Sequence, residues 1–144
     1  MTQPTASAIC DDIAARIRVG APILGGNIVP APPEGPPAGL TAWLDYGPVE
    51  MDWGLMEVSQ PTITVTVATN RKGHYPGEYR TVTDAMQEVH WALRGSYVIA
   101  TEAVIVDATI SRAGGAQYAG IEIVAATMTL TIEMKQQNVA AGAA

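Results

Sequence analysis

Apolar residues near the start of the chain recur at helical spacing. Ile9, Ile13 and Ile17 follow one another at intervals of four, and Cys10 lies on the same stripe. This spacing predicts an amphipathic helix with one buried face. Gly20 predicts the end of this helix, because glycine favours the position just after a helix.

A second helix is predicted after a loop at residues 70–75. Thr81 and Asp84 have the spacing of a capping box, and a start one turn earlier also fits the pattern. Gly95 predicts its end. Its buried face is predicted to consist of Val82, Ala85, Met86, Val89 and Leu93.

Several other stretches alternate between apolar and polar residues, as strands do. The clearest is residues 62–69, where Ile63, Val65 and Val67 alternate with threonines. Strands are also predicted at residues 39–46 and 49–58. The last two, residues 102–110 and 118–134, are predicted to pair antiparallel, because the glycine-containing residues 111–116 between them suit a hairpin loop.

The last predicted strand is too long for a compact chain of this size. Seventeen residues would extend about 56 Å, whereas a domain of this length is only about 40 Å across. Its apolar positions also change parity between Ile123 and Val124, which predicts a β-bulge or bend there. Its threonines at 127, 129 and 131 match those at 62, 64 and 66, so these two strands are expected to pair. A neighbouring subunit is the alternative partner for the excess length.

The proline-rich residues 30–37, PAPPEGPP, lack the backbone donors that a β-ladder needs. They are predicted to form an extended connector on the surface, and a peptide ligand for another protein is the alternative. The whole pattern predicts an α+β fold with a mixed, mainly antiparallel sheet. Two helices pack on this sheet in the order α-β-β-β-α-β-β, and the chain closes with a long hairpin. Residues 1–144 are expected to form one domain, with an ordered core at about 6–135 and a flexible tail at 136–144.

Composition narrows the classes of function. Hydrophobic residues make up 48% of the chain and charged residues 15%, a surface that favours self-association. The net charge of −6 argues against a protein that grips nucleic-acid phosphates. Cys10 is the only cysteine, so an internal disulfide is excluded and a reducing cytoplasm is the expected setting for assembly. No targeting or membrane-spanning stretch is expected.

Residues that could carry chemistry do not form a recognisable site. His74 and His90 are the only imidazoles, and neither has a predicted base or nucleophile beside it. The carboxylates Glu50, Asp52 and Glu57 could in principle act as acid and base, but no pattern brings them to a shared pocket. Neither of the glycine pairs, at 25–26 and 114–115, joins a strand to a helix as a phosphate loop does. No enzyme activity, metal or cofactor is therefore predicted.

Interface residues are predicted from apolar side chains in the strand predicted at residues 49–58 and from the cationic loop at residues 70–75. The three tryptophans, Trp43, Trp53 and Trp91, are interpreted as core or interface anchors. Ordinary core or loop packing is the alternative for all of these side chains. The predicted interface set is Met51, Trp53, Met56, Arg71, Lys72, His74, Tyr75 and Tyr118.

The end of the chain carries a family resemblance. The run Gly114-Gly115-Ala116-Gln117-Tyr118-Ala119-Gly120 leads into a threonine-rich strand that ends Leu130-Thr131-Ile132-Glu133. Together with the element order and length across residues 6–135, and with the Tyr-x-Gly near the start of the last strand, this resembles the tail terminator proteins of long-tailed bacteriophages. The proline-rich insert has no fixed counterpart in that family.

The resemblance implies a structural virion protein, assembled in the host cytoplasm and placed at the head-proximal end of the tail. It implies a homohexameric ring that caps the tail tube, stops its polymerisation and joins it to a neck or head-completion protein. DNA would pass through the lumen of the ring without specific binding. Three alternatives stay open: another virion ring protein such as a neck or tail-tube subunit, a small dimeric α+β enzyme, and a cytoplasmic ligand-binding module.

Overall fold

The computed structural model describes residues 6–35, 37, 39–46, 62–70, 75–94, 98–100 and 103–134. The strand predicted at residues 49–58 and the loop with Arg71, Lys72 and His74 lie outside these ranges. The elements are α1 (Ala6–Gly20), the 3-10 helix η1 (Pro22–Leu24), β1 (Ile28–Val29), β2 (Thr41–Tyr46), β3 (Thr62–Asn70), α2 (Tyr75–Arg94), β4 (Val98–Ala100), β5 (Ala103–Ile110), β6 (Gly114–Tyr118) and β7 (Ile121–Met134).

The strands form one mixed sheet in the order β1-β2-β3-β7-β5-β4, and β6 pairs with β7 beside this path. Only β1 and β2 run parallel, and the other pairs are antiparallel. The predicted α+β class with a mainly antiparallel sheet is therefore confirmed. The short strands β1, β4 and β6 are additions to the predicted elements.

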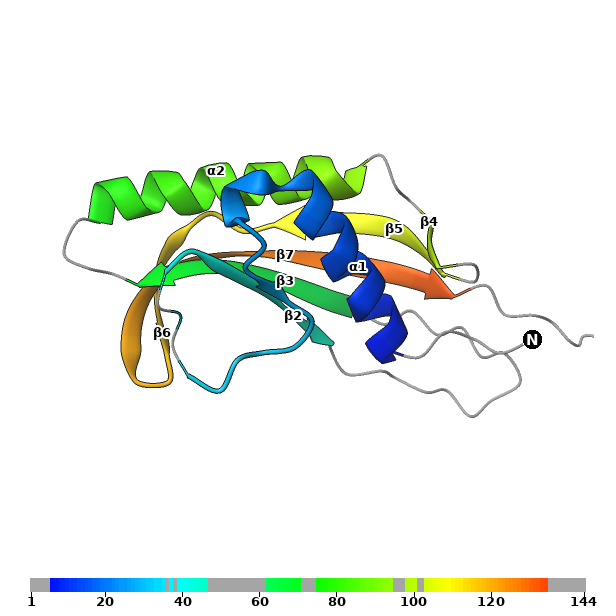
Figure 1. Cartoon of the computed structure of the whole chain (residues 1–144), viewed down its shortest axis with the longest axis horizontal. Coiled ribbons are helices and arrows are strands. Elements are labelled where there is room, and N and C mark those ends of the chain that lie inside the picture. Colours follow the sequence, from blue (N-terminus) through cyan, green and yellow to red (C-terminus); the bar gives the residue numbers. More distant parts are fainter. Residues whose placement is uncertain are drawn as a thin grey trace, which may run out of the picture.

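Both helices cover the same face of the sheet (Figure 1). The stripe predicted for α1 is buried, and so is the whole stripe predicted for α2. They meet alternate residues of β2, β3 and β7 in one core, because successive strand residues point to opposite faces. The close approach of α1 to α2 needs Gly20, since a Cβ atom there would lie 2.5 Å from the Cβ of Ala92. The first helix ends at this glycine, as predicted, whereas α2 begins at Tyr75, ahead of the capping box at Thr81.

The long last strand is paired along its whole length within the subunit. β3 pairs with residues 123–131 of β7, and its threonines lie opposite those of β7: Thr62 faces Thr131, Thr64 faces Thr129 and Thr66 faces Thr127. On the other edge, β5 pairs with residues 128–134 and β6 with residues 121–125. The predicted threonine match is confirmed, and every residue of β7 has a strand partner on at least one side within the subunit.

The predicted β-bulge at Ile123 and Val124 is wrong. The register between β3 and β7 continues unbroken through both residues. The parity of the apolar residues changes because the strand is buried on both faces at this point. Val124 lies in the core under the helices, whereas Ile123 lies in a second cluster with Trp43 and Ala68 on the opposite face. The irregularity is in β5 instead, where Val106 is an extra residue between the pairs of Ile105 and Asp107.

The predicted antiparallel pairing of the last two strands is confirmed, because β5 pairs with β7. The tight turn, however, lies further along the chain than the predicted loop at residues 111–116. The glycines at 114 and 115 belong to β6, and the turn between β6 and β7 is formed by Ala119 and Gly120. Both have positive φ angles, 53° and 79°, which is the backbone that a two-residue hairpin turn requires. The last strand consequently begins at Ile121 rather than at residue 118. The β6–β7 hairpin curves away from the other strands in Figure 1.

Candidate functional site

The predicted interface set is only partly within the described residues. Met51, Trp53 and Met56 lie outside them, as do Arg71, Lys72 and His74. Tyr75 is the first residue of α2. Tyr118, at the end of β6, is half-buried against the second cluster.

Tyr118 joins three separate parts of the chain on the helix-free face of the sheet. Its ring lies 5.0 Å from the ring of Trp43 on β2, with the planes tilted by 45°. Its hydroxyl donates a hydrogen bond to the backbone carbonyl of Pro33. The proline-rich connector is thus held against its own subunit, and residues 30–32, 34 and 35 within it are exposed, as expected of a surface connector.

Of the histidines and carboxylates considered for chemistry, only His90 lies within the described residues. His90 is half-buried on α2 next to Trp91, with 6.0 Å between their ring centroids. Glu50, Asp52 and Glu57 lie outside the described residues. Among the described residues, no group of three or more His, Cys, Asp or Glu side chains could hold a metal ion. The helices of the described chain include none that is both long and apolar enough to cross a membrane.

Cys10 packs in the core, as its place on the α1 stripe predicts. Burial raises the pKa of its thiol above the ordinary value, and the negative charges of Asp11 and Asp45 raise it further. The thiol is therefore held in its protonated form, in which it is a poor nucleophile. A cleft of about 340 Å³ lies beside Cys10, between α1, the connector and β2.

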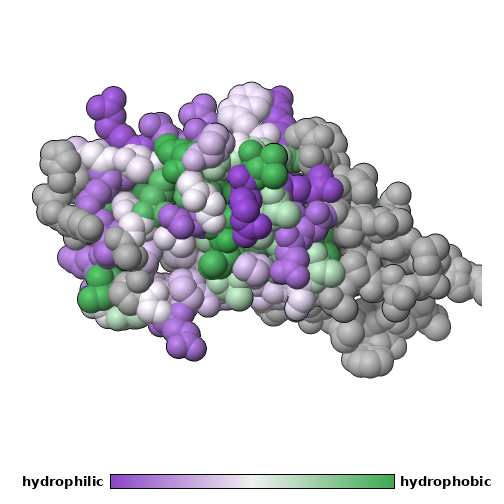
Figure 2. Space-filling view, in the orientation of Figure 1, coloured by the Kyte–Doolittle hydropathy of each residue, from purple (hydrophilic) through white to green (hydrophobic). Residues whose placement is uncertain are grey.

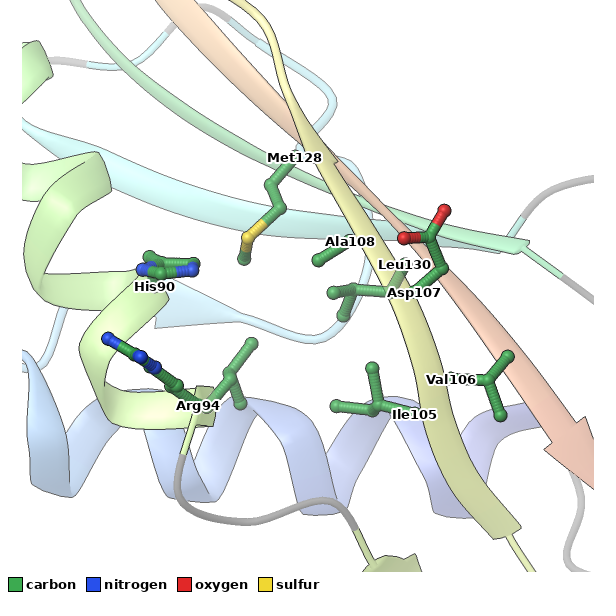
Figure 3. Close-up of a pocket in the computed structure, with 9 residues that line it drawn as sticks. His90, Arg94, Ile105, Val106, Asp107, Ala108, Met128 and Leu130 are labelled. Carbon is green, nitrogen blue, oxygen red and sulfur yellow. The ribbon is translucent and has the colours of Figure 1, made fainter.

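A groove runs between α2 and β5 on the helix-bearing side of the sheet. Two cavities form it, of about 140 Å³ and 420 Å³, and His90 lines both. Core side chains of β7 form part of its floor, and these are Ala126, Met128 and Leu130. In Figure 3 the side chains of Met128 and His90 point into the smaller cavity, whereas the carboxylate of Asp107 points away from it.

The lining of the groove includes two arginines and exposed apolar side chains of β5. Arg94 lines the smaller cavity and Arg112 the larger. On β5, Val106 is 48% exposed and Ile110 is 44% exposed. On α2, Trp91 is 56% exposed, and the guanidinium of Arg94 lies 4.9 Å from its ring centroid.

The outer edge of β5 is open beside this groove. In the described chain, β4 pairs only with Ala103 and Val104, so residues 105–110 have no strand on that side. An unpaired edge presents backbone N–H and C=O groups to any strand that can lie against it. The groove, this edge and Trp91, which lies beside Arg94, together form the surface that we call the α2–β5 surface.

The α2–β5 surface was not predicted from the sequence, although one signal was present. Trp91 lies outside the apolar stripe of its helix, so a large aromatic ring had to face away from the core. Figure 2, which has the orientation of Figure 1 with α1 toward the viewer, shows apolar residues as separate spots among polar ones.

Comparison with known proteins identifies a shared fold. No protein-family model matches the sequence, and no curated protein matches it. Among solved structures, the chain is similar to a chain from the "Virion of native gene transfer agent (GTA) particle", with 21% identity and a TM-score of 0.51. The likeness covers 86% of this chain and 93% of that one. It therefore concerns the arrangement of nearly the whole chain rather than a single motif.

Proposed function

We propose that this protein is a structural component of a phage-like virion, and that it acts as a tail terminator. The observation that carries the proposal is the fold shared with a gene transfer agent virion chain over 86% of this sequence. The family resemblance of residues 114–134 supports the more specific role. This role consists of binding to other virion proteins and includes no reaction.

The terminator would act as a closed ring, expected to be a hexamer. A ring needs two different surfaces on each subunit, because each copy contacts the next head to tail. The α2–β5 surface supplies one candidate, with Val106 and Ile110 exposed in the lining of its groove and Trp91 exposed beside Arg94. Residues 51–56 and the loop at 71–75 remain candidates for contact with the next subunit or with the tail tube.

The ring would bind the tail-tube protein on one side and a neck or head-completion protein on the other. DNA would pass through its lumen, and the net charge of −6 suits a channel that must not retain a polyanion. Charge reversal of the carboxylates that line the channel tests this part. Unchanged DNA passage and ring formation in those variants would contradict it.

Two measurements test the proposed function. Native mass spectrometry of the purified protein, alone and with tail-tube protein, should detect closed hexamers in the presence of the tube. The second measurement adds the protein to assembling tails and records tail length and attachment to heads. A terminator should give tails of uniform length that join heads, whereas unchanged tails and unchanged joining would refute the role.

The same measurements separate the alternatives. A tail-tube subunit would polymerise into long tubes, and a neck protein would restore head joining without limiting tail length. A small enzyme would form dimers and leave tail assembly unaffected. An albumin control at the same concentration excludes a non-specific effect of added protein.

A further inference from the structure

We propose that the α2–β5 groove of one subunit receives residues 47–61 of a second copy of this chain. This inference rests on the proposed ring and names the two surfaces that would join its subunits. It assigns a binding site to the groove and a contact partner to the residues 51–56 considered above.

The groove has the chemistry of a site for an apolar segment with negative charge. Its floor consists of core side chains, including Leu93 and Met128, so an inserted apolar side chain would continue the core. Arg94 and Arg112 line its two cavities, and Figure 3 shows the carboxylate of Asp107 directed away from the smaller one. An occupant with carboxylates would therefore meet cations at the groove.

Residues 47–61 have the complementary composition. They read GPVEMDWGLMEVSQP and contain three carboxylates and no Lys, Arg or His. Apolar and acidic residues alternate at 49–53, a pattern that suits an extended segment laid along a strand edge. The open edge of β5 at residues 105–110 offers that backbone partner.

The length and attachment of this segment favour a neighbouring subunit. It joins the end of β2 to the start of β3, whose residues Tyr46 and Ile63 are paired. A loop of fifteen residues anchored at two adjacent strand ends can reach roughly 25 Å from the sheet. Within its own subunit, α1 contacts both β2 and β4 and so lies across the direct path over the helix-bearing face to the groove. The groove of the next copy in a ring is free of that obstacle.

Disulfide trapping between two different variants tests the contact. One variant carries Ala108→Cys in the groove, the other carries Gly54→Cys in the segment, and both carry Cys10→Ala. Mixed under mild oxidation with tail-tube protein present, they should form a mixed disulfide, because the two thiols meet only when the segment of one chain lies in the groove of another. A matched control replaces Ala108→Cys by Ala15→Cys, which places the thiol at an exposed position on α1.

Charge reversal adds a second readout. Adding Arg94→Glu and Arg112→Glu to the groove variant should lower the rate of mixed-disulfide formation about tenfold, since like charges then face the carboxylates of the segment. Adding Glu50→Lys and Asp52→Lys to the other chain should restore most of that loss. Thermal unfolding of each variant verifies that the fold is retained.

These experiments distinguish a failure of the proposed contact from a failure of the proposed terminator role. Closed hexamers without a mixed disulfide above the Ala15→Cys control would overturn this inference and leave the ring intact. A disulfide within one chain carrying both cysteines, but none between chains, would also overturn it. A mixed disulfide that depends on the arginines, in a protein that never caps tails, would support the contact and refute the terminator role.

Discussion

Replacement of Trp43 tests whether the helix-free face of the sheet has a stabilising core of its own. Trp43 is 4% exposed and packs with Ala68, Ile123 and Tyr118, so its truncation to alanine leaves a large cavity. Loss of a buried tryptophan of this kind lowers the free energy of unfolding by about 3–5 kcal/mol. At this chain length, such a loss corresponds to a fall in Tm of about 10–20 °C.

The coupling of Trp43 to Tyr118 makes the test specific. Tyr118→Ala should cost about 2 kcal/mol, because a half-buried ring and the hydrogen bond to the Pro33 carbonyl are both lost. The double variant should be about 1 kcal/mol more stable than the sum of the two single effects predicts, because either single substitution already removes the contact between the two rings. Tyr118→Phe isolates the hydrogen bond and should cost about 1 kcal/mol.

Urea denaturation followed by circular dichroism measures the free energy of unfolding of these four variants and of the native chain. Trp91→Ala is the matched control, because that tryptophan is 56% exposed and its loss should cost less than about 1 kcal/mol. Equal losses for Trp43→Ala and Trp91→Ala, or strictly additive effects of Trp43→Ala and Tyr118→Ala, would refute a second core. An unchanged stability of Tyr118→Ala combined with lost assembly would instead assign that ring to an interface.

Three further predictions concern single positions. Gly20→Ala should lower the free energy of unfolding by about 1–3 kcal/mol in urea titrations despite the better helix propensity of alanine, because its Cβ would lie 2.5 Å from that of Ala92, and adding Ala92→Gly should recover most of the loss. Ala119→Gly should stabilise the protein by about 0.5–1 kcal/mol, measured as a rise in Tm, because φ is +53° there and glycine adopts this backbone without strain; a fall would contradict the turn geometry. Because burial raises the pKa of Cys10, its contribution to stability is fully present below the ordinary pKa of 9.0 and is lost as the pH rises through the folded value. Denaturation from pH 8 to 10.5 should accordingly show a steeper decline for the native chain than for Cys10→Ala, and parallel curves would refute a raised pKa.

Periodicity predicted the helix-bearing core almost residue by residue. The stripe of α2 and the alternation of Ile63, Val65 and Val67 are all buried as predicted, because a helix or strand with one apolar face has only one way to bury it. The threonines opposite them predicted the pairing of β3 with β7, since side chains at matching positions share one face of the sheet. These features depend on local spacing, which a sequence displays directly.

The candidate site could not be predicted from residue spacing in the same way. The groove between α2 and β5 depends on how far one helix and one strand lie apart, and residue spacing carries no such distance. Its lining comes from three separate parts of the chain, which are α2, residues 105–113 and residues 126–130 of β7. Only the off-stripe position of Trp91 pointed to that surface.

Local sequence patterns were sufficient to predict the α+β class, both helix stripes, the threonine match between β3 and β7, and the burial of Cys10. How the last strand is accommodated could be seen only in the folded chain. β6 pairs with β7 through a turn at Ala119 and Gly120. Ile123 packs in the second cluster with Trp43, so the strand is buried on both faces there. This two-sided burial, and not a bulge, explains why the apolar positions change parity. The physical reason is that a period of two identifies the two faces of a strand, whereas only the surrounding chain determines whether one or both are covered.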